Sequence, residues 1–185
     1  MNNSSFNRRE AFSLMGAAAL GTGLWGGLSQ PALAQPVNSR RRRCLRVAHL
    51  TDLHVQPERR ATEGMTACLH HVQELKDPPQ LILTGGDSIM DSFGADDART
   101  QLQWDIWNKV LGDECSLPVR SAIGNHDIWG WNKSSSKTKG DEPNYGKLRS
   151  TEMLKIDNRY DTFCQGGWQF IVLDSTQPHP KNPDA

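Results

Sequence analysis

Short, mostly apolar runs predict five strands in the part of the chain that follows residue 43. Three of them stand apart, at residues 44–50, 81–84 and 119–123. Runs of this length and apolar content are typical of strands that are buried on both faces. The remaining two, at residues 160–164 and 168–173, are separated by a pair of glycines. That spacing predicts a β-hairpin with a tight turn.

Two segments with the helical period of about 3.6 residues lie between the predicted strands. The first covers residues 62–75 and is stopped by the Asp-Pro-Pro sequence at 77–79. The second covers residues 96–111, and a short third helix, capped by Ser150 or Thr151, is predicted to run to residue 156. The inward residues are expected to be Met65, Cys68, Leu69, Val72 and Leu75 in the first helix and Leu102, Ile106, Val110 and Leu111 in the second.

Residues 128–147 are polar, contain several glycines and show no periodicity, so a long loop is predicted there. Loops of this length inside a compact domain are usually functional or mobile. Because the segment contains Trp129, Trp131 and several lysines, two interpretations stay open. It is either a lid over an anionic substrate or a solvated, mobile loop. Trp104 and Trp107, on the second helix, are expected to pack in the core or at its edge.

The alternation of strands and helices predicts a layered α/β fold. With 185 residues, of which 36% are hydrophobic and 23% charged, the chain is long enough for one domain with a sizeable core. No internal repeat and no second domain is evident in the sequence.

The charge balance argues against a nucleic-acid surface. The net charge is +0, and removing residues 1–34 takes away Arg8, Arg9 and Glu10, which leaves a net charge of −1. The one basic run, at residues 40–43, is short and is interpreted as a solvated leader. We therefore expect no nucleic-acid-binding surface.

Residues 1–34 have the pattern of an export signal and are excluded from the fold prediction. Arg8 and Arg9 precede an apolar stretch, and the A-x-A sequence that ends at Ala34 fits a signal-peptidase site. The paired arginines are similar to a twin-arginine signal, which the twin-arginine export machinery reads. We expect cleavage after Ala34, a polar linker at residues 35–43, no transmembrane span in the mature chain, and a periplasmic or extracellular location. An ordinary secretory signal and an uncleaved anchor are the alternatives.

The four cysteines do not form a recognisable metal or redox motif. Cys44, Cys68, Cys115 and Cys164 are widely spaced, and no two of them make a C-x-x-C pair. In an oxidising compartment a disulfide is possible, with three full pairings open, and buried free thiols are the equally plausible alternative.

Three polar clusters each follow a predicted buried strand. They are Asp52-Leu53-His54, Gly85-Gly86-Asp87 and Gly124-Asn125-His126-Asp127. In layered α/β folds, ligands bind at the carboxyl ends of neighbouring strands, so we expect the three segments to converge on one edge of the sheet. Carboxylate, imidazole and amide oxygen are ligands for a hard or borderline divalent metal. The sequence therefore predicts a metal site, with both side chains of the first cluster leaving an extended segment on the same side.

These clusters resemble the motifs of the calcineurin-like metallophosphoesterase family. The family pattern is D-x-H, then G-D-x-x-x-D, then G-N-H-D or G-N-H-E, followed by a single His and by G-H-x-H. Here the first three motifs are Asp52-Leu53-His54, Gly86 to Asp91, and Gly124 to Asp127, and the resemblance covers residues 44–175. It implies a β-sandwich flanked by helices and the metal-dependent hydrolysis of small phosphate-ester substrates. The D-x-H form and the export signal look more like the branch that includes cyclic-nucleotide phosphodiesterases.

The resemblance also implies the role of each motif residue. Asp52 and His54 would hold the first of two metal ions, Asp87 would bridge both, and Asn125 would bind the second. Iron, manganese and zinc all suit such ligands. Paired metal ions are a standard device for phosphoester hydrolysis.

His126 and Asp127 are the catalytic candidates. By resemblance, His126 would contact the phosphate and protonate the leaving oxygen. Asp127 would orient it, and a carboxylate beside a histidine fixes the tautomer of the ring. Asp91 is expected to have a structural role in its loop, and His49 is expected to pack in the core.

The last two family motifs do not occur in the sequence. Only His179 follows His126, and its position favours a loop residue. We expect residues 44–185 to be the N-terminal part of a longer metallophosphoesterase domain, incomplete at its C-terminus. Two functions remain: a dinuclear phosphoesterase in the intact protein, or a truncated or degenerate chain that binds metal without turnover.

Overall fold

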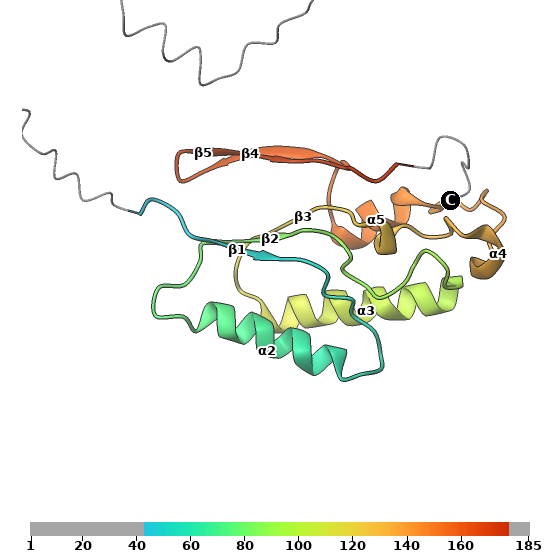
Figure 1. Ribbon diagram of the computed structural model, residues 1–185, viewed down its shortest axis with the longest axis horizontal. Coiled ribbons are helices and arrows are strands. Elements are labelled where there is room, and N and C mark those ends of the chain that lie inside the picture. Colours follow the sequence, from blue (N-terminus) through green and yellow to red (C-terminus); the bar gives the residue numbers. More distant parts are fainter. Residues whose placement is uncertain (1–42, 178–185) are drawn as a thin grey trace, which may run out of the picture. The chain divides into compact units, whose positions relative to one another are not determined.

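A three-stranded parallel sheet forms the centre of the computed structural model, which describes residues 43–177. Strands β1 (Val47–Leu50), β2 (Leu81–Thr84) and β3 (Val119–Ser121) stand in the order β1-β2-β3 (Figure 1). Each pair is parallel, with Val47 opposite Leu81 and Ile82 opposite Val119. The predicted signal peptide, most of the linker and His179 lie outside the described residues.

Helices α2 (Ala61–Gln73) and α3 (Asp97–Glu114) pack against each other and cover one face of this sheet (Figure 1). The side chain of Asp96 caps α3 by accepting a hydrogen bond from the amide of Arg99, 3.1 Å away. This bond satisfies one of the free amides at the helix N-terminus, so the helix begins where the sequence predicted. The core between helices and sheet contains Val55, Met65, Leu69, Val72, Ile82, Ile89, Trp104, Trp107, Val110, Ile123, Ile128 and Leu154.

The inward face predicted for the second helix was partly wrong. Leu102 is 46% exposed, whereas Trp104 and Trp107 are fully buried, which confirms the expectation that they pack in the core or at its edge. Gln103 is also buried, because its side chain bonds to the backbone of Asp91. Two large indoles and one hydrogen-bonded amide therefore set the rotation of α3, rather than the leucine.

The segment predicted as a long loop is folded. Its backbone contains the short helix α4 (Lys133–Ser136) and an antiparallel bridge between Trp129 and Gly146. Trp129 is buried, and the Tyr145 hydroxyl donates to the carbonyl of Gly130 at 3.1 Å. Outside α4 and this bridge, residues 128–146 consist of turns, bends and loop, so the predicted long loop is largely confirmed. The pattern of polar residues did not reveal the bonds within it.

Helix α5 (Lys147–Leu154) begins three residues before the predicted cap. Ser150 is buried inside the helix, and its hydroxyl donates to the carbonyl of Asp127 at 2.8 Å instead of capping the helix. Its neighbour Arg149 is 1% exposed; the guanidinium bonds to the Asp97 carboxylate and lies 4.8 Å from the centroid of the Trp129 ring. Arg149 thus joins α5 to the start of α3 and to the folded segment before α5.

Strands β4 (Asp161–Gln165) and β5 (Trp168–Val172) form the predicted hairpin. Gly166 and Gly167 make its turn with φ values of 56° and 80°, a conformation that glycine adopts without a steric penalty. Phe163 and Phe170 stack across the hairpin with ring centroids 4.9 Å apart, and the Arg120 guanidinium of β3 lies 5.0 Å from the Phe163 ring. The hairpin forms a second, separate two-stranded sheet.

The described residues therefore form a mixed α/β fold with a parallel sheet and helices, as predicted. All four cysteines are free thiols, but Cys44 and Cys164 are exposed and Cys68 and Cys115 are half-buried. The alternative of buried free thiols is therefore right about the missing disulfide and wrong about burial. Among residues 43–177, no helix is long and apolar enough to span a membrane.

Candidate metal centre

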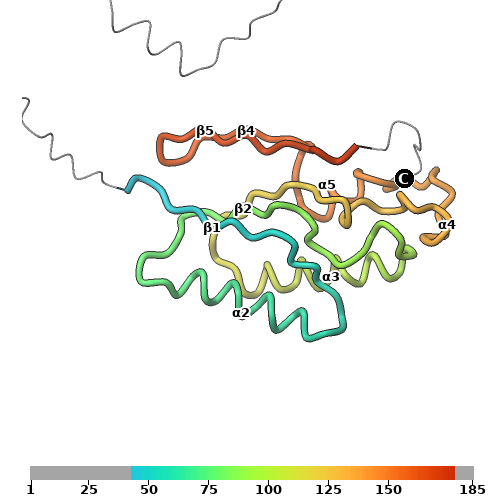
Figure 2. Tube along the Cα trace, viewed as in Figure 1, coloured from blue at the N-terminus to red at the C-terminus, as the bar shows by residue number. Residues whose placement is uncertain are grey.

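Two of the motif segments continue to pair after their strands have ended. The amide of Asp52 donates to the carbonyl of Gly86 at 3.1 Å, and the amide of His54 donates to the carbonyl of Asp87 at 3.0 Å. A parallel bridge between Val55 and Ile89 follows. The trace shows the two segments leaving the sheet side by side (Figure 2). This pairing brings the first two clusters together, as the positions of the strand ends predicted.

The backbone at the candidate ligands is left-handed. Asp52, His54 and Asp87 have φ values of 56°, 48° and 52°. The expectation that Asp52 and His54 lie on an extended segment is therefore wrong, although their side chains do converge. A non-glycine residue in this region costs on the order of 1–3 kcal/mol, and such residues gather at functional sites.

The side chains of Asp52, His54 and Asp87 form a cluster that fits a metal ion. One potential ligand atom from each lies within 4.8 Å of the others, and the distance from His54 Nε2 to Asp52 Oδ1 is 3.8 Å. The Nδ1 atom of His54 is buried and has no hydrogen-bond partner among the described residues. A buried polar atom without a partner is costly, so this imidazole is suited to a ligand that the protein does not itself provide. Two carboxylates and one imidazole are a suitable donor set for a divalent metal.

The third motif segment approaches the second closely. A Cβ atom on Gly124 would lie 2.1 Å from Asp87 Oδ1 and 2.2 Å from Asp87 N, so only glycine fits there. The amide of His126 donates to Asp87 Oδ1 at 2.9 Å, and the rings of His126 and His54 are 4.8 Å apart in an edge-to-face arrangement. Asn125 begins a single turn of 3₁₀ helix (Asn125–Asp127) and is exposed. His126 thus lies beside the cluster, and Asn125 stands on the same turn.

The orientation of His126 differs from the expectation. Its Nδ1 atom lies 2.5 Å from the carbonyl oxygen of Met90, which can only accept a hydrogen bond. The Asp127 carboxylate instead bonds to the backbone amides of Ser88, Ile89 and Gly124. The prediction that Asp127 orients His126 therefore needs correction, because a backbone carbonyl has that position. A carbonyl carries no signal in a sequence, so sequence reasoning missed it.

The Asp127 carboxyl has a raised pKa. The residue is 0% exposed, and burial raises the pKa of its carboxyl to about 7. The three backbone amides act in the opposite direction, and the neighbouring Asp87 carboxylate adds to the rise. Loss of hydration therefore outweighs hydrogen bonding at this carboxyl.

Two further residues near the motifs have clear positions. Asp91 holds its own loop, because its Oδ1 accepts from the amide of Gly94 at 2.8 Å and its backbone is bonded to Gln103. This agrees with the structural role predicted for it. His49 is exposed, so the expectation of a core histidine is wrong. Its ring borders Gly85, where an added Cβ would lie 2.8 Å from His49 Nε2.

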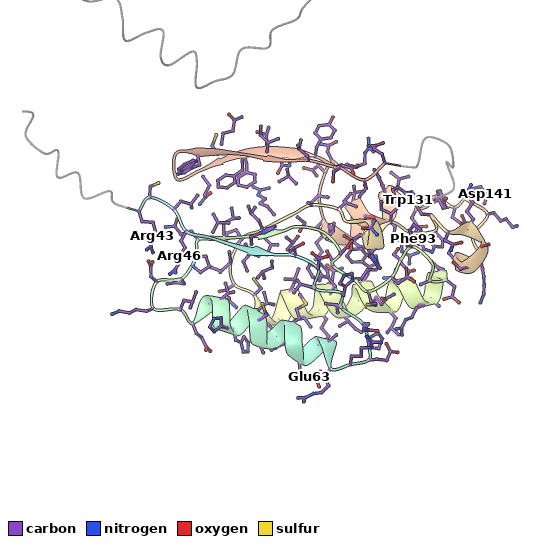
Figure 3. The ribbon with its side chains drawn as sticks, viewed as in Figure 1. Arg43, Arg46, Glu63, Phe93, Trp131 and Asp141 are labelled. Atoms are coloured by element: carbon purple, nitrogen blue, oxygen red, sulfur yellow. The ribbon has the colours of Figure 1, made fainter. Side chains whose placement is uncertain are left out.

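Two aromatic side chains extend from the segments next to His126. The amide of Ser92 donates to the carbonyl of His126 at 2.8 Å, and the amide of Asn132 donates to the carbonyl of Phe93 at 3.0 Å. Phe93 and Trp131 meet edge to face with ring centroids 6.3 Å apart (Figure 3). The Lys147 ammonium lies 5.8 Å from the Trp131 ring centroid.

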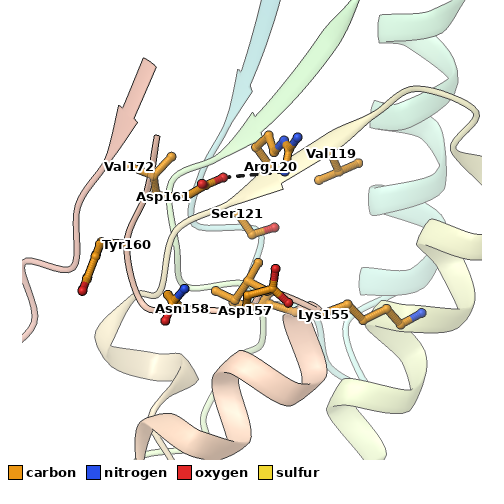
Figure 4. A pocket seen from close by; sticks show the side chains of 11 residues that line it. Val119, Arg120, Ser121, Lys155, Asp157, Asn158, Tyr160, Asp161 and Val172 are labelled. Atoms are coloured by element: carbon orange, nitrogen blue, oxygen red, sulfur yellow. Dashed lines mark ion pairs between the residues drawn. The ribbon is translucent and has the colours of Figure 1, made fainter. Parts of the chain in front are cut away.

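A partly open pocket of about 160 Å³ lies elsewhere, between β3, the end of α5 and the hairpin. Its wall includes the ion pair between Arg120 and Asp161, at 3.6 Å (Figure 4). None of the residues that line it belongs to the three motifs. The metal cluster is therefore separate from this pocket.

The arrangement of these motif residues agrees with a comparison of the sequence with family models. The model described as calcineurin-like phosphoesterase matches residues 45–181, which include all three motif segments. No curated protein matches the chain. Since this match spans most of the chain, the protein belongs to the calcineurin-like phosphoesterase family.

Proposed function

We propose that this protein hydrolyses small phosphate esters at a centre of two metal ions. The observation that carries the proposal is the cluster of Asp52, His54 and Asp87, with its buried and unpaired imidazole nitrogen. Metal ions bound there would clamp the phosphate and lower the pKa of a bound water. Iron, manganese and zinc each suit the donor set.

Within this proposal Asp87 would hold both ions. Its carboxylate faces the other two ligands and also accepts the amide of His126, so it stands between the first and third motif segments. Asn125 would bind the second ion. Its exposed position on the turn beside His126 supports that assignment.

His126 is the proposed general acid. The carbonyl of Met90 requires a proton on Nδ1, so Nε2 is the nitrogen that can give or take a proton. A ring held in one tautomer is suited to protonating a leaving oxygen. The edge-to-face contact with His54 supports a position within reach of a substrate at the metal ions.

The test compares the wild type with the Asp87→Asn variant. Metal content is measured after purification, together with hydrolysis of p-nitrophenyl phosphate and bis-p-nitrophenyl phosphate, a monoester and a diester. Two ions per chain, with metal and activity both lost in Asp87→Asn, would support the proposal. The Asp113→Asn variant, which changes an exposed carboxylate on α3, is the matched control.

A second candidate is a chain that binds metal without turnover. It is favoured by one observation: among residues 43–177 a single group of three His or carboxylate side chains comes together. Two metal ions usually need more ligands than these three and Asn125 supply. This ligand set favours one bound ion and low activity. About one ion per chain and no hydrolysis would favour this candidate, whereas a metal-free wild type would contradict both.

We also propose that residues 1–34 direct export through the twin-arginine machinery. The support is the pair Arg8 and Arg9, followed by the apolar stretch and the A-x-A sequence. Expression of the whole chain, fractionation of the cells and N-terminal sequencing would test it. We expect the exported protein to begin at Gln35, and we expect replacement of both arginines by lysine to abolish export.

A further inference from the structure

The Asp127 carboxylate connects two motif segments through their backbone. Its Oδ1 atom accepts hydrogen bonds from the amides of Ser88 and Ile89 at 2.8 and 3.3 Å. Its Oδ2 atom accepts from the amide of Gly124 at 2.9 Å. Because the side chain is fully buried, water does not compete for these bonds.

A second carboxylate connects the same segments in the opposite direction. Asp87 belongs to the second motif, and its Oδ1 atom accepts the amide of His126 in the third, at 2.9 Å. Each segment therefore offers one carboxylate to the backbone of the other. The two backbones also approach so closely that a Cβ on Gly86 would lie 2.5 Å from the nitrogen of Gly124.

We propose that Asp127 is a positioning residue that fixes the separation of the second and third motif segments. It does so through the three amides, and it thereby places the Asp87 carboxylate and the His126 backbone relative to each other. As far as it concerns metal, this inference rests on the proposed function. Asp127 therefore acts on the position of the metal ligand Asp87, which lies in another segment of the chain, and not on the His126 ring.

An isosteric substitution separates this role from the mere filling of space. In Asp127→Asn the volume is kept, but one oxygen becomes an NH₂ group that faces a backbone N–H, so donor opposes donor. The control is Ser150→Ala, which removes the buried hydroxyl bond to the carbonyl of Asp127 and leaves the carboxylate intact. Both variants are expected to lose stability, but only the first changes the connection between the segments.

The first readout needs no metal. Amide hydrogen exchange of the metal-free 185-residue chain is followed by NMR at His126, whose amide bonds to Asp87 and not to Asp127. We expect exchange at His126 to become roughly tenfold faster in Asp127→Asn, as for the loss of about one hydrogen bond. In Ser150→Ala we expect it to stay unchanged relative to the sheet amides. Unchanged exchange at His126 in Asp127→Asn would overturn the inference. So would equal acceleration in both variants.

The second readout is binding of Co²⁺ followed by its visible absorption spectrum. We expect Asp127→Asn to weaken binding by roughly 10- to 100-fold and to alter the spectrum, and Ser150→Ala to leave both as in the wild type. The same affinity and spectrum in all three proteins would overturn the inference. A wild type that binds no Co²⁺, Mn²⁺ or Zn²⁺ would refute the proposed function, and the exchange at His126 would still decide the role of Asp127.

Discussion

The closest contact at the candidate metal centre makes Gly124→Ala the most informative single substitution. Gly124 has φ −97° and ψ 172°, values that alanine also adopts without strain. The backbone conformation therefore does not require glycine. Glycine is required because the segment that contains Asp87 lies so close: an added Cβ would lie 2.1 Å from Asp87 Oδ1 and 2.2 Å from Asp87 N.

The size of the effect follows from these distances. Ordinary van der Waals contact begins at 3.4 Å, so the two segments would have to separate by about 1.3 Å to accept the methyl group. Overpacking of this kind costs about 1–3 kcal/mol of stability. A displacement of about 1 Å at reacting groups lowers a rate by about 100-fold. Because the obstacle includes the backbone nitrogen of Asp87, a side-chain rotation cannot relieve it.

The assay combines thermal unfolding, metal content and phosphodiester hydrolysis. The matched control is Gly112→Ala, since Gly112 lies within α3 and a Cβ there meets nothing within 4 Å. We expect the control to gain about 0.5–1 kcal/mol, because alanine favours a helix more than glycine does. The reasoning is refuted if Gly124→Ala keeps the wild-type metal content and unfolding temperature while the control behaves as expected.

Three other predictions concern charge and catalysis. Asp97→Asn should lower the free energy of unfolding by about 1.5–3 kcal/mol, although Asp97 is itself largely exposed, because it leaves the buried Arg149 guanidinium without its charged partner. Thermal unfolding measures this loss, and the control Asp113→Asn should have no measurable effect. The metal-free protein should lose stability as pH rises from about 4 to about 7, since folded Asp127 keeps its proton up to a pKa of about 7 while the unfolded carboxyl releases it near 3.8. The loss should be on the order of a few kcal/mol and should be absent in Asp127→Asn. Urea unfolding across this pH range measures it. If the free energy of unfolding changed with pH equally in both proteins, the prediction would be wrong. His126→Ala should lower hydrolysis by about 100- to 10,000-fold without changing metal content, and loss of the metal would instead make His126 a ligand.

The sequence predicted most elements because their signals are local. The apolar run at 81–84 is a strand with the predicted bounds, and the two glycines at 166 and 167 make the predicted turn. The first helix is present, and Met65, Leu69 and Val72 are buried as predicted. Cys68 and Leu75, also predicted to point inward, are only half-buried, and Leu75 lies beyond the helix end at Gln73. Such signals depend on the period and chemistry of neighbouring residues, which a sequence contains directly.

Predictions failed where distant segments decide the outcome. Leu102 matched the helical period but is exposed, because Trp104 and Trp107 fill the space against the sheet. The segment from 128 to 147 is largely the predicted loop, but its polar pattern did not predict that Trp129 is buried and forms a bridge with Gly146. No local sequence pattern indicates that Trp129 packs against the buried guanidinium of Arg149.

The sequence by itself determined the chemistry of this protein: which residues can hold a metal, in which order, and at the ends of which strands. Only the tertiary structure decided how those residues are held. The left-handed backbone at Asp52, His54 and Asp87, the Met90 carbonyl at His126, and the three amides on Asp127 arise from backbone atoms that every residue has. Side-chain identity is encoded residue by residue, whereas the hydrogen-bond partner of a backbone amide or carbonyl depends on which segment of the chain folds beside it.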